Sequence, residues 1–170
     1  MCRTVDLHAI YDAHFDYVWH TLRRLGIRHE DCEDLAHDVF LVVHRRAKDF
    51  DNERPMKPWL FGISYRVVAD FRRLAKHSRE VFSDAEHLDE RPDAEATLEQ
   101  KRKLALCDRA LAKIDLERRA VLVLHDIDGE PVPQVAEALG IPLNTAYSRL
   151  RVAREEFAAA ARRLERESAR

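Results

Sequence analysis

The chain has 170 residues, a net charge of −2, 46% hydrophobic and 35% charged residues, and only four glycines. This composition is typical of a soluble, helix-rich globular protein and excludes a mainly disordered chain. No apolar run approaches the roughly 20 residues that cross a bilayer, and the N-terminal segment lacks the apolar stretch of a secretory signal, so we expect a cytoplasmic protein with no membrane partner. Cys2, Cys32 and Cys107 are odd in number and far apart, which predicts no disulfide framework.

Three segments in the first half repeat apolar residues every three or four positions, which predicts three helices around one small core. The first ends at Gly26 and turns inward Leu7, Ile10, Tyr11, Phe15, Val18, Leu22 and Leu25. The second begins near His29, with carboxylates that favour the positive end of the helix dipole, and turns inward Leu35, Val39, Val42, Val43, Ala47 and Phe50. The third follows the breaker DNERPMKP and turns inward Trp59, Leu60, Ile63, Val67, Phe71 and Leu74.

The segment 79–97 is acidic, contains a proline and has weak periodicity, so we interpret it as a flexible linker. Beyond it, periodicity returns with Leu104, Cys107, Leu111 and Ile114, followed by Asp115 as a helix N-cap and by a turn at 128–129. No strand pattern is present in the sequence. The predicted fold is all-α, with two small helical domains, 1–78 and 98–170, joined by the acidic linker.

The stretch PVPQVAEALGIPLNTAYSRLRVAR predicts a helix-turn-helix. Pro133 suits a first helical turn, Ala136 is small where two helices cross, and Gly140 permits a left-handed turn. Asn144 or Thr145 is expected to cap the second helix. That helix would lie in the DNA major groove, and its candidate DNA-binding residues are Asn144, Thr145, Tyr147, Ser148, Arg149, Arg151 and Arg154. The alternative is a plain helical hairpin with a polar face.

Residues 54–80 form a basic segment with seven basic and two acidic side chains, and residues 141–170 form a second with seven and four. Two basic surfaces favour two contacts with a polyanion, although solvated helix faces would look the same. Aromatic residues among the cations of the first segment suit unpaired DNA, because rings stack on exposed bases. Tyr65 and Arg66 lie off the apolar stripe and are expected to be free for binding, whereas core packing explains Trp59 and Phe71 equally well.

Three stretches, EDLAHDVFLVVHRR, FDNERPMKPWLFGISYRVVADFRR and LGIPLNTAYSRLRVAR, resemble in order and spacing the extracytoplasmic-function group of bacterial sigma factors. The resemblance extends from about Tyr11 to Leu164. It implies an N-terminal region two domain and a C-terminal region four domain joined by a flexible linker. It also implies core RNA polymerase and promoter DNA as partners, an anti-sigma factor as an open further partner, and no catalysis, cofactor, metal or small-molecule substrate.

The resemblance assigns three sets of residues. The residues implied to bind core polymerase are Glu33, Asp34, Leu35, Asp38 and Phe40. The segment from Phe50 to Arg73 matches the part that melts the minus-ten element. Together with the basic segment 54–80, this match gives the candidate minus-ten DNA-binding residues Phe50, Trp59, Tyr65, Arg66, Arg72, Arg73 and Lys76. The residues that match the helix reading the minus-thirty-five element are Thr145, Ser148, Arg149 and Arg154.

The sequence departs from the family pattern at several DNA-facing positions. Tyr65 and Arg66 stand where many members have Arg and Asn, and Asn144 and Tyr147 stand where Gly and Lys or Arg are usual. Promoter sequence therefore cannot be carried over from the family. Arginine can still pair with a base edge or a phosphate, and tyrosine can stack, so DNA binding remains expected.

Two other functions fit parts of the sequence. A helix-turn-helix regulator that acts without polymerase would explain the second half, but it gives no role to the acidic second helix or to the aromatic and basic third helix. A metal-dependent phosphohydrolase is suggested only by the dipeptides at 37–38 and 125–126, both His-Asp. His29, Cys32 and His37 could lie near one helix face, but such a site would need further ligands from other helices.

Overall fold

The computed structural model describes residues 7–51, 53–77 and 97–168, and all regular elements within these ranges are helical. The N-terminal half contains α1 (Leu7–Arg24), α2 (His29–Arg46) and α3 (Met56–His77), with the short 3-10 turn η1 (Ala47–Asp49) after α2. Gly26 lies in the turn after α1 and has a positive φ of 90°, so it ends that helix region as the sequence predicts. The three helices contact one another in every pair and bury the side chains Val18, Trp19, Leu22, Val39, Val43, Leu60, Phe61, Ile63 and Val68.

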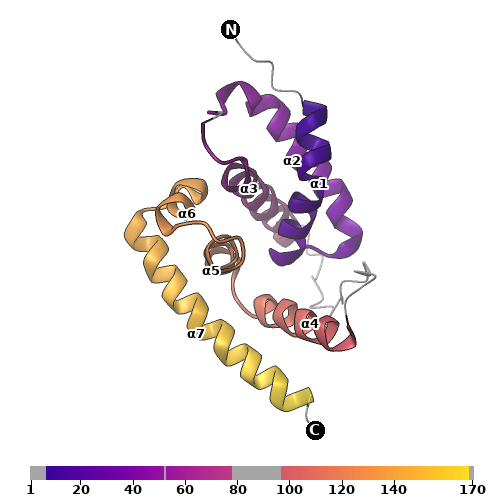
Figure 1. Ribbon diagram of the computed structural model, residues 1–170, viewed down its shortest axis with the longest axis vertical. Coiled ribbons are helices and arrows are strands. Elements are labelled where there is room, and N and C mark those ends of the chain that lie inside the picture. The colour runs from indigo at the N-terminus through magenta and orange to yellow at the C-terminus, as the bar shows by residue number, and fades with distance from the viewer. Residues whose placement is uncertain (1–6, 52, 78–96, 169–170) are drawn as a thin grey trace.

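The C-terminal half contains α4 (Leu98–Ala112), α5 (Leu116–Leu122), the π-helical turn η2 (Val123–Ile127), α6 (Val132–Leu139) and α7 (Leu143–Ser168). The long helix α7 runs along the outside of α4, α5 and α6 (Figure 1). Asp115 caps α5 by accepting the backbone N–H of Arg118 at 3.0 Å, as predicted. Thr97 caps α4 through reciprocal hydrogen bonds with Gln100.

The helix-turn-helix is present as α6 and α7. Pro133 lies in the first turn of α6, and Gly140 ends that helix in the left-handed conformation at φ 67°. The expected cap of the next helix is wrong, because α7 begins at Leu143 and therefore includes Asn144 and Thr145 in its first turn. The backbone N–H of Ala146 donates to the carbonyl of Pro142 at 3.0 Å, which is the first hydrogen bond of the helix and makes Pro142 the N-cap residue.

The two halves pack against each other. Helix α3 contacts α6, and α1 contacts α4 (Figure 1). Buried side chains from both halves form one continuous core. The closest approach is at Gly62, where an added Cβ would lie 2.4 Å from the carbonyl oxygen of Ala138. Only a glycine allows the two helix backbones to meet at this separation. Apart from Thr97, the predicted linker lies outside the described residues.

Some residues of the predicted apolar stripes are exposed. Leu74 is 65% exposed and Leu104 is 61% exposed, and Cys107 is also on the surface. On α3, the next buried apolar residue after Ile63 is Val68, while Val67 is half-buried. The apolar periodicity of one helix does not show which of its turns another helix covers, so Leu74 near the end of α3 and Leu104 in the middle of α4 stay in solvent. Within the described residues, no helix has the length and apolarity to cross a membrane.

Candidate polymerase and nucleic-acid interfaces

Helix α2 presents an acidic face. Three of the five predicted polymerase-binding residues, Glu33, Asp34 and Asp38, are exposed on it. The other two, Leu35 and Phe40, are each only 5% exposed and belong to the core. The structure therefore separates this set into three carboxylates that a partner can reach and two apolar side chains that hold the helix in place.

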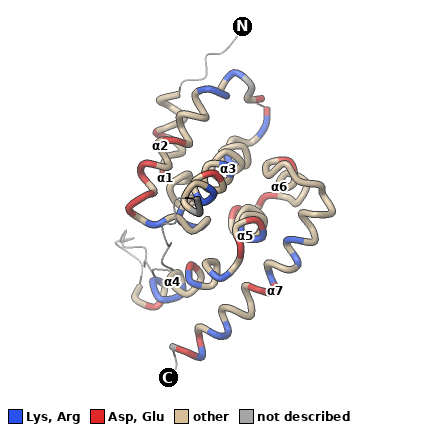
Figure 2. The backbone as a smooth tube through the Cα atoms, turned by 180° about the vertical axis from the view of Figure 1, so that it is seen from behind, with Lys and Arg blue, Asp and Glu red and all other residues tan. Residues whose placement is uncertain are grey.

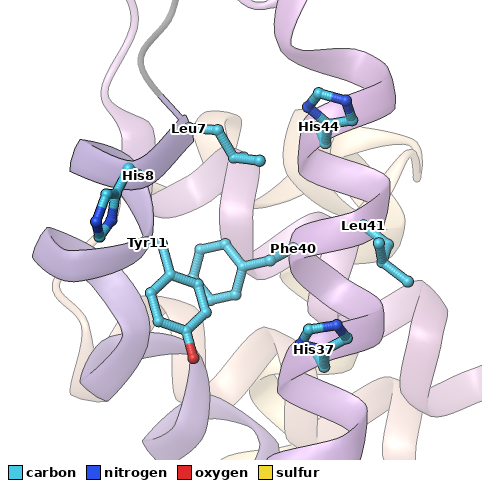
Figure 3. A pocket seen from close by; sticks show the side chains of 7 residues that line it. All are labelled: Leu7, His8, Tyr11, His37, Phe40, Leu41 and His44. Carbon is cyan, nitrogen blue, oxygen red and sulfur yellow. The ribbon is translucent and has the colours of Figure 1, made fainter.

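An apolar groove of about 410 Å³ lies between the N-terminal part of α1 and the C-terminal part of α2 (Figure 3). Its lining residues are Leu7, His8, Tyr11, His37, Phe40, Leu41 and His44. Leu41 is 49% exposed and follows Phe40 directly, off the buried stripe. Leu41 is not among the residues predicted from the sequence to bind a partner. Its signal arises only from the fold, which places it beside the other apolar side chains of the groove as one exposed apolar patch.

The aromatic pair at the start of α3 comes from two elements. The rings of Phe50, after η1, and Trp59, on α3, have centroids 4.7 Å apart at an angle of 42°. Both are half-buried, and Trp59 packs against the core. The pair therefore anchors the segment before α3, and part of each ring remains accessible to solvent.

The predicted minus-ten cations on α3 have different surroundings. Arg72 is half-buried and donates to the carbonyl of Leu25 at 2.6 Å, and burial lowers the pKa of its guanidinium. It thereby satisfies a carbonyl left open where α1 ends. Arg73 is exposed and pairs with Asp70 at 3.1 Å, one turn away on the same helix. The side chain of Lys76 lies outside what the structure describes.

Tyr65 and Arg66 are in contact with the C-terminal half. Arg66 donates to the carbonyl of Ala138 on α6 at 3.2 Å. Tyr65 is half-buried, and its phenol pKa is raised first by burial and then by the carboxylate of Glu117 on α5. The expectation that both side chains are free is therefore wrong in this arrangement. Helical periodicity marks this face of α3 as polar, but it does not show that the second half of the chain contacts the same face.

The predicted DNA-binding residues of α7 have different surroundings. Arg149 pairs with Glu117 of α5, and Arg154 pairs with Asp126 of η2 at 2.8 and 2.6 Å. The pKa of Asp126 is lowered, mainly by this hydrogen bond. Asn144, Tyr147, Ser148, Arg151 and Arg154 are exposed, while Thr145 and Arg149 are half-buried. Figure 2 shows several basic positions along α7. One of them, Arg151, pairs with Glu155 on the same helix at 2.9 Å.

The two His-Asp dipeptides do not meet. His37 lies on α2, whereas His125 lies in η2 and its Nδ1 is 2.7 Å from the carbonyl oxygen of Glu130. In the part of the chain that the structure describes, no three His, Cys, Asp or Glu side chains are grouped as metal ligands. No observation favours the phosphohydrolase alternative.

Known proteins share both halves of this architecture. Residues 10–79 match the family described as Sigma-70 region 2, and residues 104–157 match Sigma-70, region 4. The ECF RNA polymerase sigma factor SigL of Mycobacterium tuberculosis is 30% identical over 149 residues, which cover 86% of this chain and 84% of that protein.

Two solved structures have the same fold. The sigma factor RpoE of Bartonella quintana, in complex with the anti-sigma factor NepR, gives a TM-score of 0.74 at 19% identity and covers 92% of this chain and 97% of that one. CnrH, in complex with the cytosolic domain of CnrY, gives 0.61 at 26% identity and covers 90% and 85%. The two matched regions, in their order along an all-helical chain, and the similarity to SigL establish that this protein belongs to the extracytoplasmic-function group of the sigma-70 family of RNA polymerase sigma factors.

Proposed function

We propose that this sigma factor uses α2 to bind core RNA polymerase, α3 to capture unpaired minus-ten DNA and α7 to read the minus-thirty-five duplex. The observation that supports this division most directly is the separation of charge: an acidic exposed face on α2, and basic residues on α3 and α7 (Figure 2). An acidic surface repels phosphates and suits a protein partner, whereas the basic helices suit DNA.

The polymerase contact combines the carboxylates with the neighbouring groove. Asp34 and Asp38 provide charge, and Leu41 provides an exposed apolar side chain close to them on the same helix. Apolar centres beside polar rims are the usual composition of protein interfaces. We assign the groove of Figure 3 to the same partner, because Leu41 and His37 belong both to the groove and to α2.

For the minus-ten element, the reachable groups are the edges of Phe50 and Trp59 and the exposed cation Arg73. Tyr65 and Arg66 join them when the C-terminal half moves off α3. Rings beside a positive side chain can stack on unpaired bases while the cation follows the phosphates. Arg72 acts as a positioning residue, because its guanidinium is bound to the end of α1.

For the minus-thirty-five element, Tyr147, Ser148 and Arg151 are exposed and are assigned to base edges, with Asn144 beside them at the helix start. Arg149 and Arg154 are assigned to orienting α7, with phosphate contacts at most, because each is paired with a carboxylate of another element, whereas Arg151 pairs with Glu155 on α7 itself. Base contacts specify sequence, whereas phosphate contacts only position the protein.

The remaining assignments concern the chain as a whole. We place the domain boundaries at 1–78 and 98–170 with the linker between them, and the site of action in the cytoplasm, where core polymerase and DNA are found. Because the solved structures of RpoE and CnrH contain NepR and a domain of CnrY, we also propose an anti-sigma factor as a partner. The protein has no catalytic role of its own in this proposal.

The test is transcription from genomic DNA by core polymerase, with and without the purified protein. New transcripts that start at a common sequence pattern only when the protein is present are the expected result. Tight binding of the protein alone to duplex DNA, with no new start sites, would instead identify a helix-turn-helix regulator that works without polymerase.

A further inference from the structure

The contact between the two halves includes a close approach of two helix backbones and side-chain hydrogen bonds. Gly62 on α3 meets the carbonyl oxygen of Ala138 on α6 so closely that no larger residue fits. Arg66 donates to that same carbonyl, which lies in the last turn of α6, where helix carbonyls have no partner within the helix. A cation at this position also suits the negative end of the helix dipole.

A second contact joins α1 to the turn after η2. The carboxylate of Asp128 is 6% exposed and accepts a hydrogen bond from the Tyr17 hydroxyl at 2.7 Å and another from Arg24 at 3.3 Å. Burial raises the pKa of Asp128, which reflects the free-energy cost of holding a carboxylate away from water. A buried carboxylate with two donors from the other domain is a complementary contact that would be lost if the halves separated.

The packed arrangement of the two halves excludes simultaneous binding of both promoter elements. Tyr65 on α3 is near enough to Arg149 on α7 for that charge to affect its pKa. The minus-ten and minus-thirty-five elements lie roughly 25 base pairs apart, which is on the order of 80 Å at ~3.4 Å per base pair. Helices α3 and α7 therefore cannot occupy both elements while their domains are packed together, and α6 holds Arg66 in the packed state.

We propose that the two contacts form an autoinhibitory latch, in which Asp128 bound to Tyr17 and Arg24, and Ala138 seated on Gly62 and Arg66, hold the free sigma factor closed. Core polymerase, which under the proposed function holds α3 and α7 at separate promoter elements, selects the open form. The apparent affinity for polymerase is therefore the intrinsic affinity multiplied by the fraction of open molecules. The inhibition needs no second protein. This inference rests on the proposed assignment of α3 and α7 to the two promoter elements.

The first test compares two variants of the full chain. Tyr17→Phe removes one donor from the buried carboxylate of Asp128, whereas Arg163→Ala removes an exposed ion pair with Glu167 within α7, which belongs to neither contact. We expect Tyr17→Phe to increase the radius of gyration in small-angle X-ray scattering and to tighten core polymerase binding by about three- to tenfold, the effect of removing one side-chain hydrogen bond. Arg163→Ala should change neither quantity.

The second test uses the close approach of the helices. In Gly62→Ala, the new methyl collides with the Ala138 carbonyl, but alanine is the better residue for the interior of α3 taken alone. We expect this variant to keep its helicity and, like Tyr17→Phe, to expand and bind polymerase more tightly. Amide hydrogen exchange should become faster at the residues of α3 and α6 that face each other.

The opposite perturbation closes the latch covalently. Arg54 and Glu137 form an exposed ion pair between the halves, so Arg54→Cys with Glu137→Cys, combined with Cys2→Ser and Cys107→Ser, allows a short bis-maleimide to join them. The cross-linked protein should fail to open promoters that the same protein opens before cross-linking.

The outcomes separate the latch from the proposed function. Equal promoter opening before and after cross-linking, or expanded variants with unchanged polymerase affinity, would overturn the autoinhibition. A parent protein that is already extended in solution would overturn the closed state. If the parent and its variants support no transcription with any core polymerase, the proposed function fails, and the scattering comparison still decides whether the latch exists.

Discussion

Arg154 on α7 forms a bidentate ion pair with Asp126 of η2: its Nε lies 2.8 Å from Oδ2 of the carboxylate, and its Nη2 lies 2.6 Å from Oδ1. The pair adds a polar contact between α7 and η2 to the packing of the buried side chains of α7. We therefore expect it to help orient the α7 side chains that face DNA.

Arg154→Ala is expected to reduce transcription from all promoters by a similar factor, with no change in sequence preference. It should also lower the free energy of unfolding by about 0.5 kcal/mol, a small value because both partners are partly exposed to solvent. Arg151→Ala, one helical turn earlier, should change the preferred bases, because an arginine contact to a base edge contributes about 1–3 kcal/mol of discrimination. Selection of active sequences from a randomised minus-thirty-five library measures both effects. A shifted preference for the Arg154 variant would assign base reading to it.

The Asp126 carboxylate should make stability depend on pH in the acid range. Its pKa in the folded state lies below the usual carboxylate value, mainly because of the hydrogen bond from Arg154. The stabilisation is therefore complete above the unfolded pKa of about 3.9 and is lost as the pH falls through the lower folded value. Chemical denaturation between neutral pH and pH 3 should show a smaller loss for Asp126→Asn than for the parent. Identical profiles would mean that the pair contributes no pH-dependent stability.

Replacing Asp34 and Asp38 together by lysine should weaken core polymerase binding by several-fold or more, because it reverses the charge of an exposed face that is assigned to that partner. Helicity should be unchanged, since both side chains are in solvent. Glu165→Lys, an exposed charge reversal on α7, is the control for a general effect of added positive charge. A titration of labelled core polymerase measures the affinity, and equal binding by all three proteins would remove α2 from the interface.

Arg66→Ala is expected to have opposite effects on two measurements. Loss of its bond to Ala138 should favour the open form and strengthen polymerase binding, whereas loss of the cation should impair promoter opening. Permanganate footprinting of unpaired thymines reports the second effect. A promoter that is already mismatched over the minus-ten region should restore part of the activity, because the unpairing cost of a few kcal/mol has been removed. Normal opening of an intact promoter by the variant would assign Arg66 to the domain contact alone.

The elements with local chemical signals were predictable from the sequence. Asp115 as an N-cap, Pro133 in a first turn and Gly140 in a left-handed turn are each determined by the backbone geometry that their residue type permits. Apolar periodicity likewise located the buried faces of α1 and α2. These signals were sufficient for the helix order and the helix-turn-helix.

What the sequence did not reveal depends on contacts between distant segments. Tyr65 lies off the apolar stripe of α3, yet it is half-buried because α5 and α7 approach that face. Arg149 and Arg154 have the residue type of DNA readers, and only the packing of α7 against α5 and η2 reveals their carboxylate partners. Leu104 continues a helical repeat but remains exposed. Periodicity describes one helix at a time and contains no information on how domains dock.

The π-helical turn η2 has a consequence for how the length of the gene can change. Asp126 lies within η2 and faces α7, while Asp128 lies just beyond it and faces α1. A π-helical turn holds one more residue than an α-helical turn. Within 123–127 this wider turn lies directly beside both carboxylates, the one that pairs with α7 and the one that bonds to α1. One short segment therefore supports both contacts, and a change in its length is expected to disturb them together.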